Sequence, residues 1–308
     1  MRGLGLKGLY LSKASRNYAG LESNATSDYV IFGVPFDSST SYKPGTRFGP
    51  DSIRQASASL ESNSYFSDIY LEEIGIDDEG DVAVVIGDIN ETLNRVSSVV
   101  AEIIDEGKIP LMLGGEHTIT LGALKGIKKG IGYSPCLIVI DAHYDLRDDY
   151  LGLRNGHASV MRRSLEILGG AKVTYIGVRA YSKEEREYAL SKTNIETFKP
   201  IDIHRMGLLN IASSVKRIMS NCKGIYLSVD MDGFDPSFAP GVGNPEPGGL
   251  TVQEGLALMN QLVDERLLGA DIVEVSPPFD SNGVTASLAA KLLNEIIMKN
   301  YISKRTKA

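Results

Sequence analysis

The chain of 308 residues contains only two cysteines, four histidines and no tryptophan. Cys136 and Cys222 lie far apart and in no CxxC pattern, so the sequence predicts neither a disulfide framework nor a zinc-finger site. We expect both to be reduced, buried thiols. No apolar run reaches the length of a membrane span, and the interrupted N-terminal stretch does not resemble a signal peptide. These absences predict a cytoplasmic protein with no membrane partner.

An excess of positive charge is also missing. The formal net charge is −7 at pH 7, whereas binding to a phosphate backbone depends on clustered lysine and arginine. Nucleic acid is therefore excluded as a partner, and a small cationic ligand suits the charge balance better. With 43% hydrophobic and 23% charged residues, the chain is long and apolar enough to fold as a globular α/β protein.

Short apolar runs alternate with segments of helical period along the chain. The runs cover residues 29–34, 82–87, 109–113, 136–141, 173–178, 225–230 and 271–275. Such continuous apolarity is typical of parallel strands buried on both faces. Residues 91–106 have a helical period that ends at Gly107, and the pairs Ser182/Glu185 and Thr251/Glu254 have capping-box spacing. We expect residues 1–308 to form a single domain with one parallel sheet covered on both faces.

Metal-capable side chains follow three of these runs. Asp141, His143 and Asp145 alternate after residues 136–140, and a strand extended through them would turn all three to one side. Asp230 and Asp232 end another run, and His117 follows a third at an expected helix start. Because ligand sites gather beyond the carboxyl ends of parallel strands, we expect four carboxylates and two imidazoles to converge. One or two divalent cations would neutralise that charge.

Taken alone, each fragment has an ordinary explanation. A single Asp-x-Asp or Asp-x-His-x-Asp is often a loop, a surface turn or a helix cap. The combination favours a metal site, because three of the four histidines, His117, His143 and His157, lie in or just after strand ends. His204 lies apart and is given no function. Carboxylates and imidazoles without thiolates suit Mn²⁺, and Zn²⁺, Co²⁺ or Ni²⁺ are alternatives.

Five stretches together resemble the ureohydrolases, the arginase and agmatinase family. They are GGEH (114–117), DAHYD (141–145), SVDMDGFDPSFAPG (228–241), residues 33–54 and residues 271–286. The resemblance covers nearly the whole chain in the correct order. It implies a three-layer αβα fold with a mostly parallel central sheet, and a trimer or hexamer. It also implies two Mn²⁺ ions per chain at the carboxyl edge of that sheet.

The resemblance assigns ligands position by position. One ion would be held by His117, Asp141, Asp145 and Asp230, and the other by Asp141, His143, Asp230 and Asp232. Asp141 and Asp230 would bridge the ions. Two such ions lower the pKa of water, which supplies a hydroxide nucleophile at neutral pH. In this family the hydroxide attacks a guanidinium carbon and yields urea and an amine.

Three residues are predicted to act in catalysis. Asp145 would hydrogen-bond the hydroxide as well as bind metal. Glu274 would bind the guanidinium group, because a carboxylate can accept two parallel hydrogen bonds from it. The alternative is that Glu274 is a capping or salt-bridged surface residue. His157 corresponds to the family's proton-shuttling histidine, and an unperturbed pKa would suit proton delivery; the alternative is a helix N-cap histidine.

The substrate is predicted to be a small cationic guanidino compound. The resemblance to agmatinases favours agmatine, which would be cleaved to putrescine and urea. The Asn- and Thr-containing stretch that reads an α-carboxylate in arginases is absent, and Ser182 stands where arginases tend to carry an acidic residue. Asp148 or Asp149 could attract the far amine of agmatine. The alternatives are arginine, guanidinobutyrate, another guanidino acid, guanidine or formiminoglutamate. A metal-binding relative without turnover is a further alternative, which retention of His157 and Glu274 argues against.

Overall fold

The computed structural model describes residues 5–22 and 27–307. Within these residues the strands are β1 (Leu11–Ser12), β2 (Tyr29–Val34), β3 (Ile76–Val82), β4 (Ile109–Gly114), β5 (Cys136–Ile140), β6 (Val173–Ile176), β7 (Ile195–Phe198), β8 (Ile225–Asp230) and β9 (Leu267–Val273). The α-helices are α1 (Leu6–Tyr10), α2 (Gly49–Ser57), α3 (Ile89–Asp105), α4 (Ile119–Ile131), α5 (Val160–Leu168), α6 (Lys183–Leu190), α7 (Pro200–Met206), α8 (Leu208–Ile218), α9 (Val252–Leu262) and α10 (Val284–Lys307). Short 3₁₀ turns include His157–Ser159 and Met231–Gly233.

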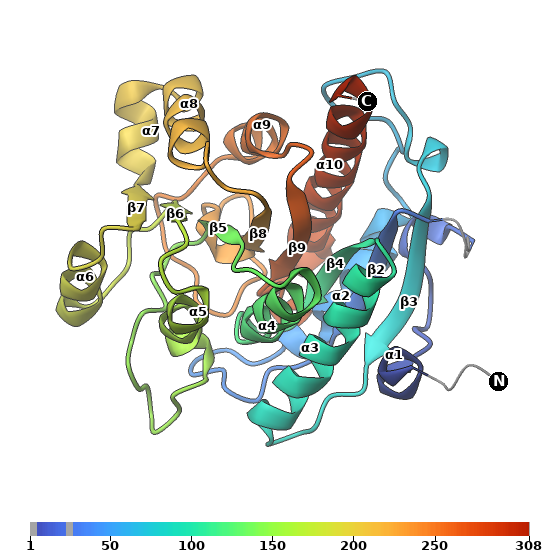
Figure 1. Cartoon of the computed structure of the whole chain (residues 1–308), viewed down its shortest axis with the longest axis horizontal. Helices are drawn as coiled ribbons and strands as arrows, with labels where there is room; N and C mark the ends of the chain where they lie inside the picture. The colour runs from blue at the N-terminus through green and yellow to red at the C-terminus, as the bar shows by residue number, and fades with distance from the viewer. Residues whose placement is uncertain (1–4, 23–26, 308) are drawn as a thin grey trace.

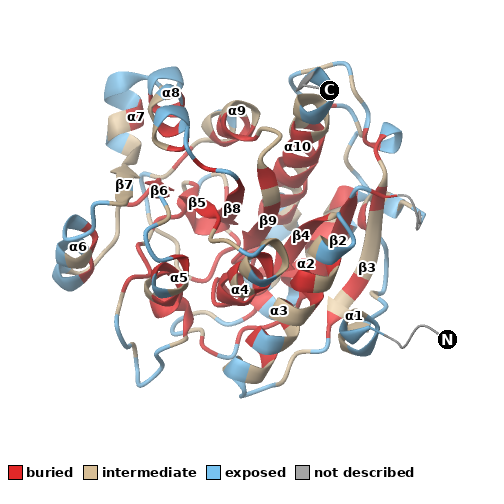
Figure 2. Cartoon of the chain, viewed as in Figure 1, coloured by how far each residue is buried: buried red, intermediate tan, exposed pale blue. Residues whose placement is uncertain are grey.

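The strands form one sheet in the order β1-β3-β2-β4-β9-β8-β5-β6-β7. All pairs are parallel except β1 with β3, which is antiparallel at one edge. Helices α3, α4 and α5 pack on one face, and α2, α8, α9 and α10 pack on the other (Figure 1). The central strands are buried while the outer helix surfaces are exposed (Figure 2). The predicted three-layer αβα fold with a mostly parallel sheet is therefore confirmed.

Alternating residues of each central strand enter the two apolar layers. On β2, Ile31 packs with one layer, while Val30 and Phe32 pack with the other. Successive side chains of a strand point to opposite faces, so a strand between two helix layers must be apolar throughout. This explains why continuous apolar runs predicted the central strands correctly.

Helix α4, which begins just after His117, packs very closely on α3. Its Gly122, Gly126 and Gly130 lie four residues apart and face α3. A Cβ atom at Gly126 would lie 2.6 Å from Val100 Cβ, so the close approach requires glycine here. The three glycines thereby set the short distance between α3 and α4.

The prediction for residues 82–87 was wrong. Strand β3 runs from Ile76 to Val82, and residues 83–88 form a loop. The strand is polar because two of its carboxylates bind the fully buried Arg54 of α2. Asp78 accepts hydrogen bonds from Arg54 Nε (2.8 Å) and Nη2 (2.9 Å), and Asp81 accepts one from Nη1 (2.6 Å). A strand that is stabilised by ion pairs has no continuous run of apolar residues, so the apolar pattern did not predict it.

Strand β7, a short and partly exposed edge strand, was not predicted either.

The helix signals were confirmed. Helix α3 covers the predicted period, and Gly107 just beyond it has φ 76°. Ser182 with Glu185 and Thr251 with Glu254 form capping boxes at the starts of α6 and α9. No helix in the described ranges is long and apolar enough to cross a membrane.

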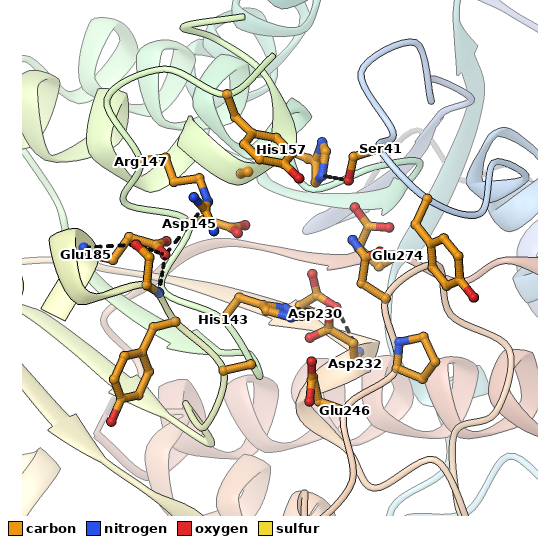
Figure 3. A pocket seen from close by; sticks show the side chains of 18 of the residues that line it. Ser41, His143, Asp145, Arg147, His157, Glu185, Asp230, Asp232, Glu246 and Glu274 are labelled. Atoms are coloured by element: carbon orange, nitrogen blue, oxygen red, sulfur yellow. Dashed lines mark hydrogen bonds and ion pairs between the residues drawn. The ribbon is translucent and has the colours of Figure 1, made fainter.

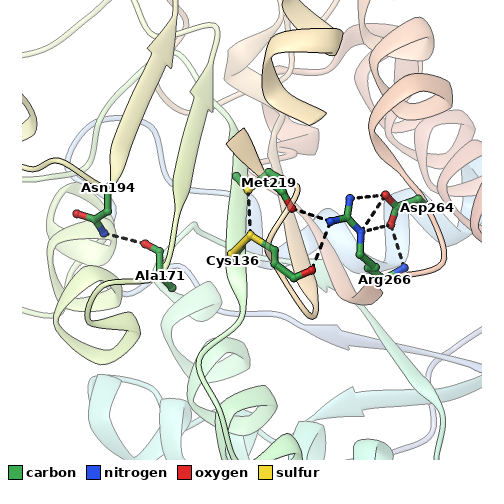
Figure 4. Close-up of a disulfide and its surroundings, with 7 residues drawn as sticks. Cys136, Ala171, Asn194, Met219, Asp264 and Arg266 are labelled. Carbon is green, nitrogen blue, oxygen red and sulfur yellow. Dashed lines mark hydrogen bonds and ion pairs between the residues drawn. A yellow bond between two sulfur atoms is a disulfide. The ribbon is translucent and has the colours of Figure 1, made fainter. Parts of the chain in front are cut away.

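The expectation of two reduced thiols was wrong, because Cys136 and Cys222 form a disulfide (Figure 4). Cys136 begins β5 and pairs in register with Ile225 of β8, three residues after Cys222. The two Cα atoms lie 6.0 Å apart, although the cysteines are 86 residues apart in sequence. Sheet pairing rather than a spacing motif brings them together. The bridge ties the start of β5, whose other end leads to Asp141, to the segment between α8 and β8.

Loss of this disulfide should destabilise the protein. A bridge that closes a loop of 86 residues restricts the unfolded chain, which corresponds to about 2 to 5 kcal/mol in the free energy of unfolding. We expect a reducing agent to lower the midpoint of guanidinium chloride unfolding by a corresponding amount. The variant with both cysteines replaced by serine should unfold at the lower midpoint with or without reductant. Equal midpoints for oxidised and reduced wild type would contradict the prediction.

Candidate active site and metal centre

The predicted site residues follow four adjacent strands. In the sheet order β4-β9-β8-β5, all neighbouring pairs are parallel, so their carboxyl ends meet at one edge. His117 follows β4, Glu274 follows β9, Asp230 ends β8, and Asp141 follows β5. Residues that are far apart in the sequence therefore meet at one point, as predicted.

His117 lies at the centre of a buried carboxylate cluster. Its Nδ1 is 3.1 Å from Asp141 Oδ2, 3.2 Å from Asp145 Oδ2 and 3.2 Å from Asp230 Oδ2. His117 is 1% exposed and Asp141 is fully buried. Neither His117 Nδ1 nor Asp141 Oδ2 makes a hydrogen bond. Buried polar atoms without partners are costly, so this geometry leaves a place that a cation would satisfy.

His143 forms a second cluster beside the first. Its Nδ1 lies 3.0 Å from Asp232 Oδ2 and 3.6 Å from Asp141 Oδ1. Asp141 is thus common to both clusters, one oxygen facing each histidine. Asp230 resembles Asp141 in one respect: its Oδ1 accepts a hydrogen bond from the Asp232 backbone N–H at 2.8 Å, as Asp141 Oδ1 does from the His143 backbone N–H at 2.5 Å. Five of the six predicted metal-ligand residues form two groups that share Asp141, and the sixth, Asp230, lies 3.2 Å from His117 Nδ1 beside the first group.

The extended-strand explanation for Asp145 was wrong. β5 ends at Ile140, and Asp145 has φ 51°, in the left-handed region that non-glycine residues seldom adopt. Its carbonyl accepts hydrogen bonds from the backbone N–H groups of Met161 (3.1 Å) and Arg162 (3.2 Å), which hold this conformation. The turned backbone brings the Asp145 carboxylate to His117.

Glu274 also has a left-handed backbone, with φ 65°. Its N–H donates to Gly115 O at 2.9 Å, and its Oε1 accepts a hydrogen bond from the His117 N–H at 2.7 Å. The side chain is 7% exposed and lines the pocket, so the surface salt-bridge alternative is excluded. Strained backbone at two neighbouring polar residues is a feature of functional sites.

His157 begins a 3₁₀ turn and is held by a loop from the N-terminal part of the chain. Its N–H donates to Ser39 Oγ at 3.0 Å, and its Nε2 lies 3.0 Å from Ser41 Oγ. Ser39 is fixed in turn by the buried carboxylate of Glu116, which accepts a hydrogen bond from the Ser39 N–H at 2.9 Å. Burial lowers the pKa of His157 to about 4, so the expectation of an unperturbed pKa was wrong. The imidazole is therefore neutral near pH 7.

A cavity of about 610 Å³ opens beside the two clusters (Figure 3). Its lining includes His143, Asp145, His157, Asp230, Asp232 and Glu274 among the predicted residues, and Ser41, Lys43, Arg147, Tyr150, Ser182, Glu185 and Glu246 besides. The suggested Asp148 does not line it, because Asp148 pairs with Arg163 on the outside, and Asp149 does not line it either. The acidic groups on its walls, Glu185 and Glu246, were missed. Glu246 lies in the loop between the Met231–Gly233 turn and α9.

Comparisons with known proteins agree with this geometry. The model of the Arginase family matches residues 27–299. An agmatinase from Pyrococcus horikoshii is 39% identical over 273 residues, which cover 88% of this chain and 91% of the relative. The chain belongs to the arginase family. An N(1)-aminopropylagmatine ureohydrolase from Thermococcus kodakarensis is 38% identical over 268 residues, covering 86% of this chain and 88% of the relative. The crystal structure of an agmatine ureohydrolase from Thermoplasma volcanium superimposes with a TM-score of 0.83 at 38% identity, covering 97% of this chain and 96% of that one.

In this member of the arginase family, two of the clustered carboxylates, Asp145 and Asp230, resist ionisation, whereas, despite its burial, the neighbouring histidines lower the pKa of Asp141. Burial, followed by the charge of Asp141, raises the pKa of Asp145 to about 7. Burial, followed by the charges of Asp232 and Asp141, raises the pKa of Asp230 well above its usual value. Burial alone would lower the pKa of His143, but the carboxylates of Asp232 and Asp141 raise it. The site therefore holds extra protons that bound cations would replace.

The donor set fits divalent cations. It consists of carboxylate oxygens and imidazole nitrogens without a thiolate, and the two clusters each offer three or more ligand atoms close together. Such ligands suit Mn²⁺ and similar ions better than soft metals.

Replacing Asp230 should remove metal. Asp230→Ala deletes a carboxylate 3.2 Å from His117 Nδ1, so we expect fewer than two divalent cations per chain by elemental analysis after dialysis against Mn²⁺. Urea release should be abolished. Asp149→Ala, which changes an exposed carboxylate outside the cavity, is the matched control and should retain the wild-type metal content. Full occupancy in Asp230→Ala would remove Asp230 from the ligand set.

Proposed function

We propose that this arginase-family hydrolase is a manganese-dependent agmatinase, which cleaves agmatine to putrescine and urea. The observation that carries the proposal is the pair of buried histidine–carboxylate clusters that opens into a cavity also lined by Glu274 and His157. A site for binding metal alone has no need of the last two residues. We also propose that the chain acts as a single domain within a homotrimer or homohexamer, as the family resemblance implies.

The proposed ligands are those of the two clusters. His117, Asp141, Asp145 and Asp230 would hold one Mn²⁺, and Asp141, His143, Asp230 and Asp232 the other. When bound, two such ions lower the pKa of water and make hydroxide available as a nucleophile at neutral pH. Asp145 lines the cavity and can accept a hydrogen bond from that nucleophile.

Glu274 is the proposed partner of the guanidinium group. Its Oε1 is anchored by the His117 N–H, which fixes the carboxylate beside the metal cluster. Burial raises the pKa of Glu274 well above its usual value, so a cationic substrate that pairs with it also stabilises its ionised form. A guanidinium carbon is a poor electrophile. Two hydrogen bonds that hold the group close to the nucleophile compensate for part of this low reactivity.

His157 is proposed to carry the proton that the reaction must move. The oxygen of water forms a bond to the guanidinium carbon, the bond from that carbon to the alkyl-bearing nitrogen breaks, and this nitrogen leaves as an amine after taking up a proton. A neutral imidazole in the cavity wall can accept a proton from the nucleophile and return it to the leaving nitrogen. Ser41, 3.0 Å from Nε2, orients the ring.

An acidic residue in the cavity wall supports an amine-terminated substrate. Glu246 lines the wall, is partly exposed, and makes none of the salt bridges found among the described residues. Glu185 is unlike it, because its carboxylate accepts hydrogen bonds from Leu146 N–H (3.1 Å) and Ser182 N–H (2.8 Å). Glu246 is therefore the wall carboxylate available to the distal ammonium group of agmatine, in place of Asp148 or Asp149.

A guanidino acid such as guanidinobutyrate is the second candidate. Lys43 and Arg147 line the same cavity, and a cation there would favour a carboxylate at the far end of the substrate. Both cations lie over aromatic rings, Lys43 5.0 Å from the centroid of Phe279 and Arg147 4.8 Å from that of Tyr150. Arginine, guanidine and formiminoglutamate remain in the substrate panel for comparison.

Agmatine should be preferred over arginine. Ser182, which lines the cavity where arginases tend to carry an acidic residue, donates its hydroxyl to Glu185 and offers no partner for an α-amino group. An unpaired charged group in a cavity costs about 1 to 3 kcal/mol or more, so kcat/KM for agmatine should exceed that for L-arginine by about tenfold or more. The measurement is urea release with Mn²⁺ at matched substrate concentrations.

The wall carboxylate provides an internal check on this preference. Glu246→Gln should raise KM for agmatine and reduce the difference in kcat/KM between agmatine and guanidinobutyrate. The control is Glu187→Gln on the outer surface of α6, which should change neither the KM nor this difference. Equal or better turnover of arginine by the wild type would refute the agmatinase assignment and leave the hydrolase site intact. No urea from any guanidino compound would refute the proposed function itself.

Proton transfer can be separated from metal binding. His157→Ala should lower kcat by roughly 10 to 10⁴-fold, the usual contribution of general acid–base catalysis, without changing the metal content. His204→Ala, which removes an exposed histidine on α7, is the control and should leave both unchanged. A wild-type kcat for His157→Ala at every pH would show that the residue only supports the loop.

A further inference from the structure

A second polar cluster is buried within the sheet next to the proposed metal centre. The carboxylate of Asp271 on β9 is fully buried and accepts three hydroxyl hydrogen bonds. Ser228 Oγ donates to Oδ1 at 2.6 Å, while Tyr226 OH and Thr120 Oγ1 donate to Oδ2 at 2.8 Å and 2.9 Å. None of the four residues lines the cavity. A carboxylate that no substrate can reach, and whose burial is costly, calls for a structural or positioning role.

The cluster is joined to the metal centre through His117. Ser228 Oγ lies 3.0 Å from His117 Nε2. A hydroxyl has one hydrogen, and Ser228 gives that hydrogen to Asp271. It must therefore accept from His117, which places a proton on Nε2. In a neutral imidazole the other nitrogen, Nδ1, then carries the lone pair.

That lone pair is directed at the proposed metal position. His117 Nδ1 is the atom that lies within 3.2 Å of the carboxylates of Asp141, Asp145 and Asp230. We propose that Asp271, acting through Ser228, is a positioning residue that fixes the Nε2–H tautomer of His117 and so presents Nδ1 as a metal ligand. The inference rests on the proposed metal centre. Metal-binding histidines commonly donate their second ring N–H to a carboxylate, and here a serine transmits that interaction.

The other two hydroxyls fix the direction of this chain of hydrogen bonds. Tyr226 and Thr120 occupy Oδ2, so Oδ1 is the oxygen that faces Ser228. In the sheet register Ser228 lies directly beside Asp271, on neighbouring strands β8 and β9. An amide at position 271 could instead donate to Ser228, which would allow Ser228 to donate to His117 Nε2 and move the ring proton to Nδ1. The metal would then meet an N–H rather than a lone pair.

The test compares the full-length wild type with Asp271→Asn, Ser228→Ala and the double variant. Mn²⁺ affinity is measured by isothermal titration calorimetry, and the ring N–H of His117 is followed by ¹⁵N NMR in the Zn²⁺-loaded, diamagnetic protein. We expect each single variant to bind Mn²⁺ about 10 to 100-fold more weakly, the usual effect of losing a partner of a metal ligand. Because both residues act through one path, the double variant should be no weaker than the weaker single one. The Nε2–H signal should be protected from solvent exchange in the wild type and lost in Ser228→Ala.

Tyr226→Phe is the matched control, since it removes a hydroxyl from Asp271 Oδ2 and leaves the contact with Ser228 in place. It should keep the Nε2–H signal and the Mn²⁺ affinity. If Asp271→Asn does not fold, the test rests on Ser228→Ala alone. In that variant Asp271 keeps its hydrogen bonds from Tyr226 and Thr120, so the buried carboxylate is still paired. Affinities within twofold of the wild type, or additive losses in the double variant, would overturn the inference while leaving the metal centre intact. A wild type that binds no Mn²⁺ would overturn the proposed metal centre and the inference together.

Discussion

Several carboxylates are buried together at one point, and the strands, helix layers and loops around them hold this charge in place. Asp141, Asp145 and Asp230 all lie within 3.2 Å of a single imidazole nitrogen, and two of them have raised pKa values in the absence of a cation. Such a cluster is unfavourable unless positive charge is supplied. Two histidines supply part of it. The positive charge that is still needed is what bound divalent cations would supply at this edge of the sheet.

Holding such a cluster together requires a rigid scaffold. Four parallel strands deliver the ligands to one edge, and two helix layers bury both faces of those strands. Local strain completes the arrangement, because Asp145 and Glu274 both adopt left-handed backbone conformations that bring their carboxylates to His117. The surrounding backbone hydrogen bonds maintain this strain, and Asp271 holds the far side of the same imidazole through Ser228.

The cavity walls carry charges of both signs, which is where members of one family can differ in substrate. In the proposed function, the metal ligands and Glu274 contact only the guanidino group, which every candidate substrate shares. Discrimination between substrates would then depend on Glu246, Lys43 and Arg147, which lie in the loops around the cavity. Loops tolerate substitution better than the strands that carry the ligands, so the chemistry can stay fixed while the far end of the substrate changes.

Local patterns predicted the central strands, the capping boxes and the residues that meet at the carboxyl edge of the sheet. These patterns are continuous apolarity, hydroxyl-to-glutamate spacing, and polar residues directly after a strand. The other features depend on contacts that exist only in the folded chain. Polar strand β3 forms because its carboxylates meet Arg54 of α2, and Cys136 meets Cys222 because β5 pairs with β8. The low pKa of His157 and the role inferred for Asp271 likewise arise from burial and from contacts across the sheet. Such contacts join residues from 24 to more than 100 positions apart, and no local pattern records them.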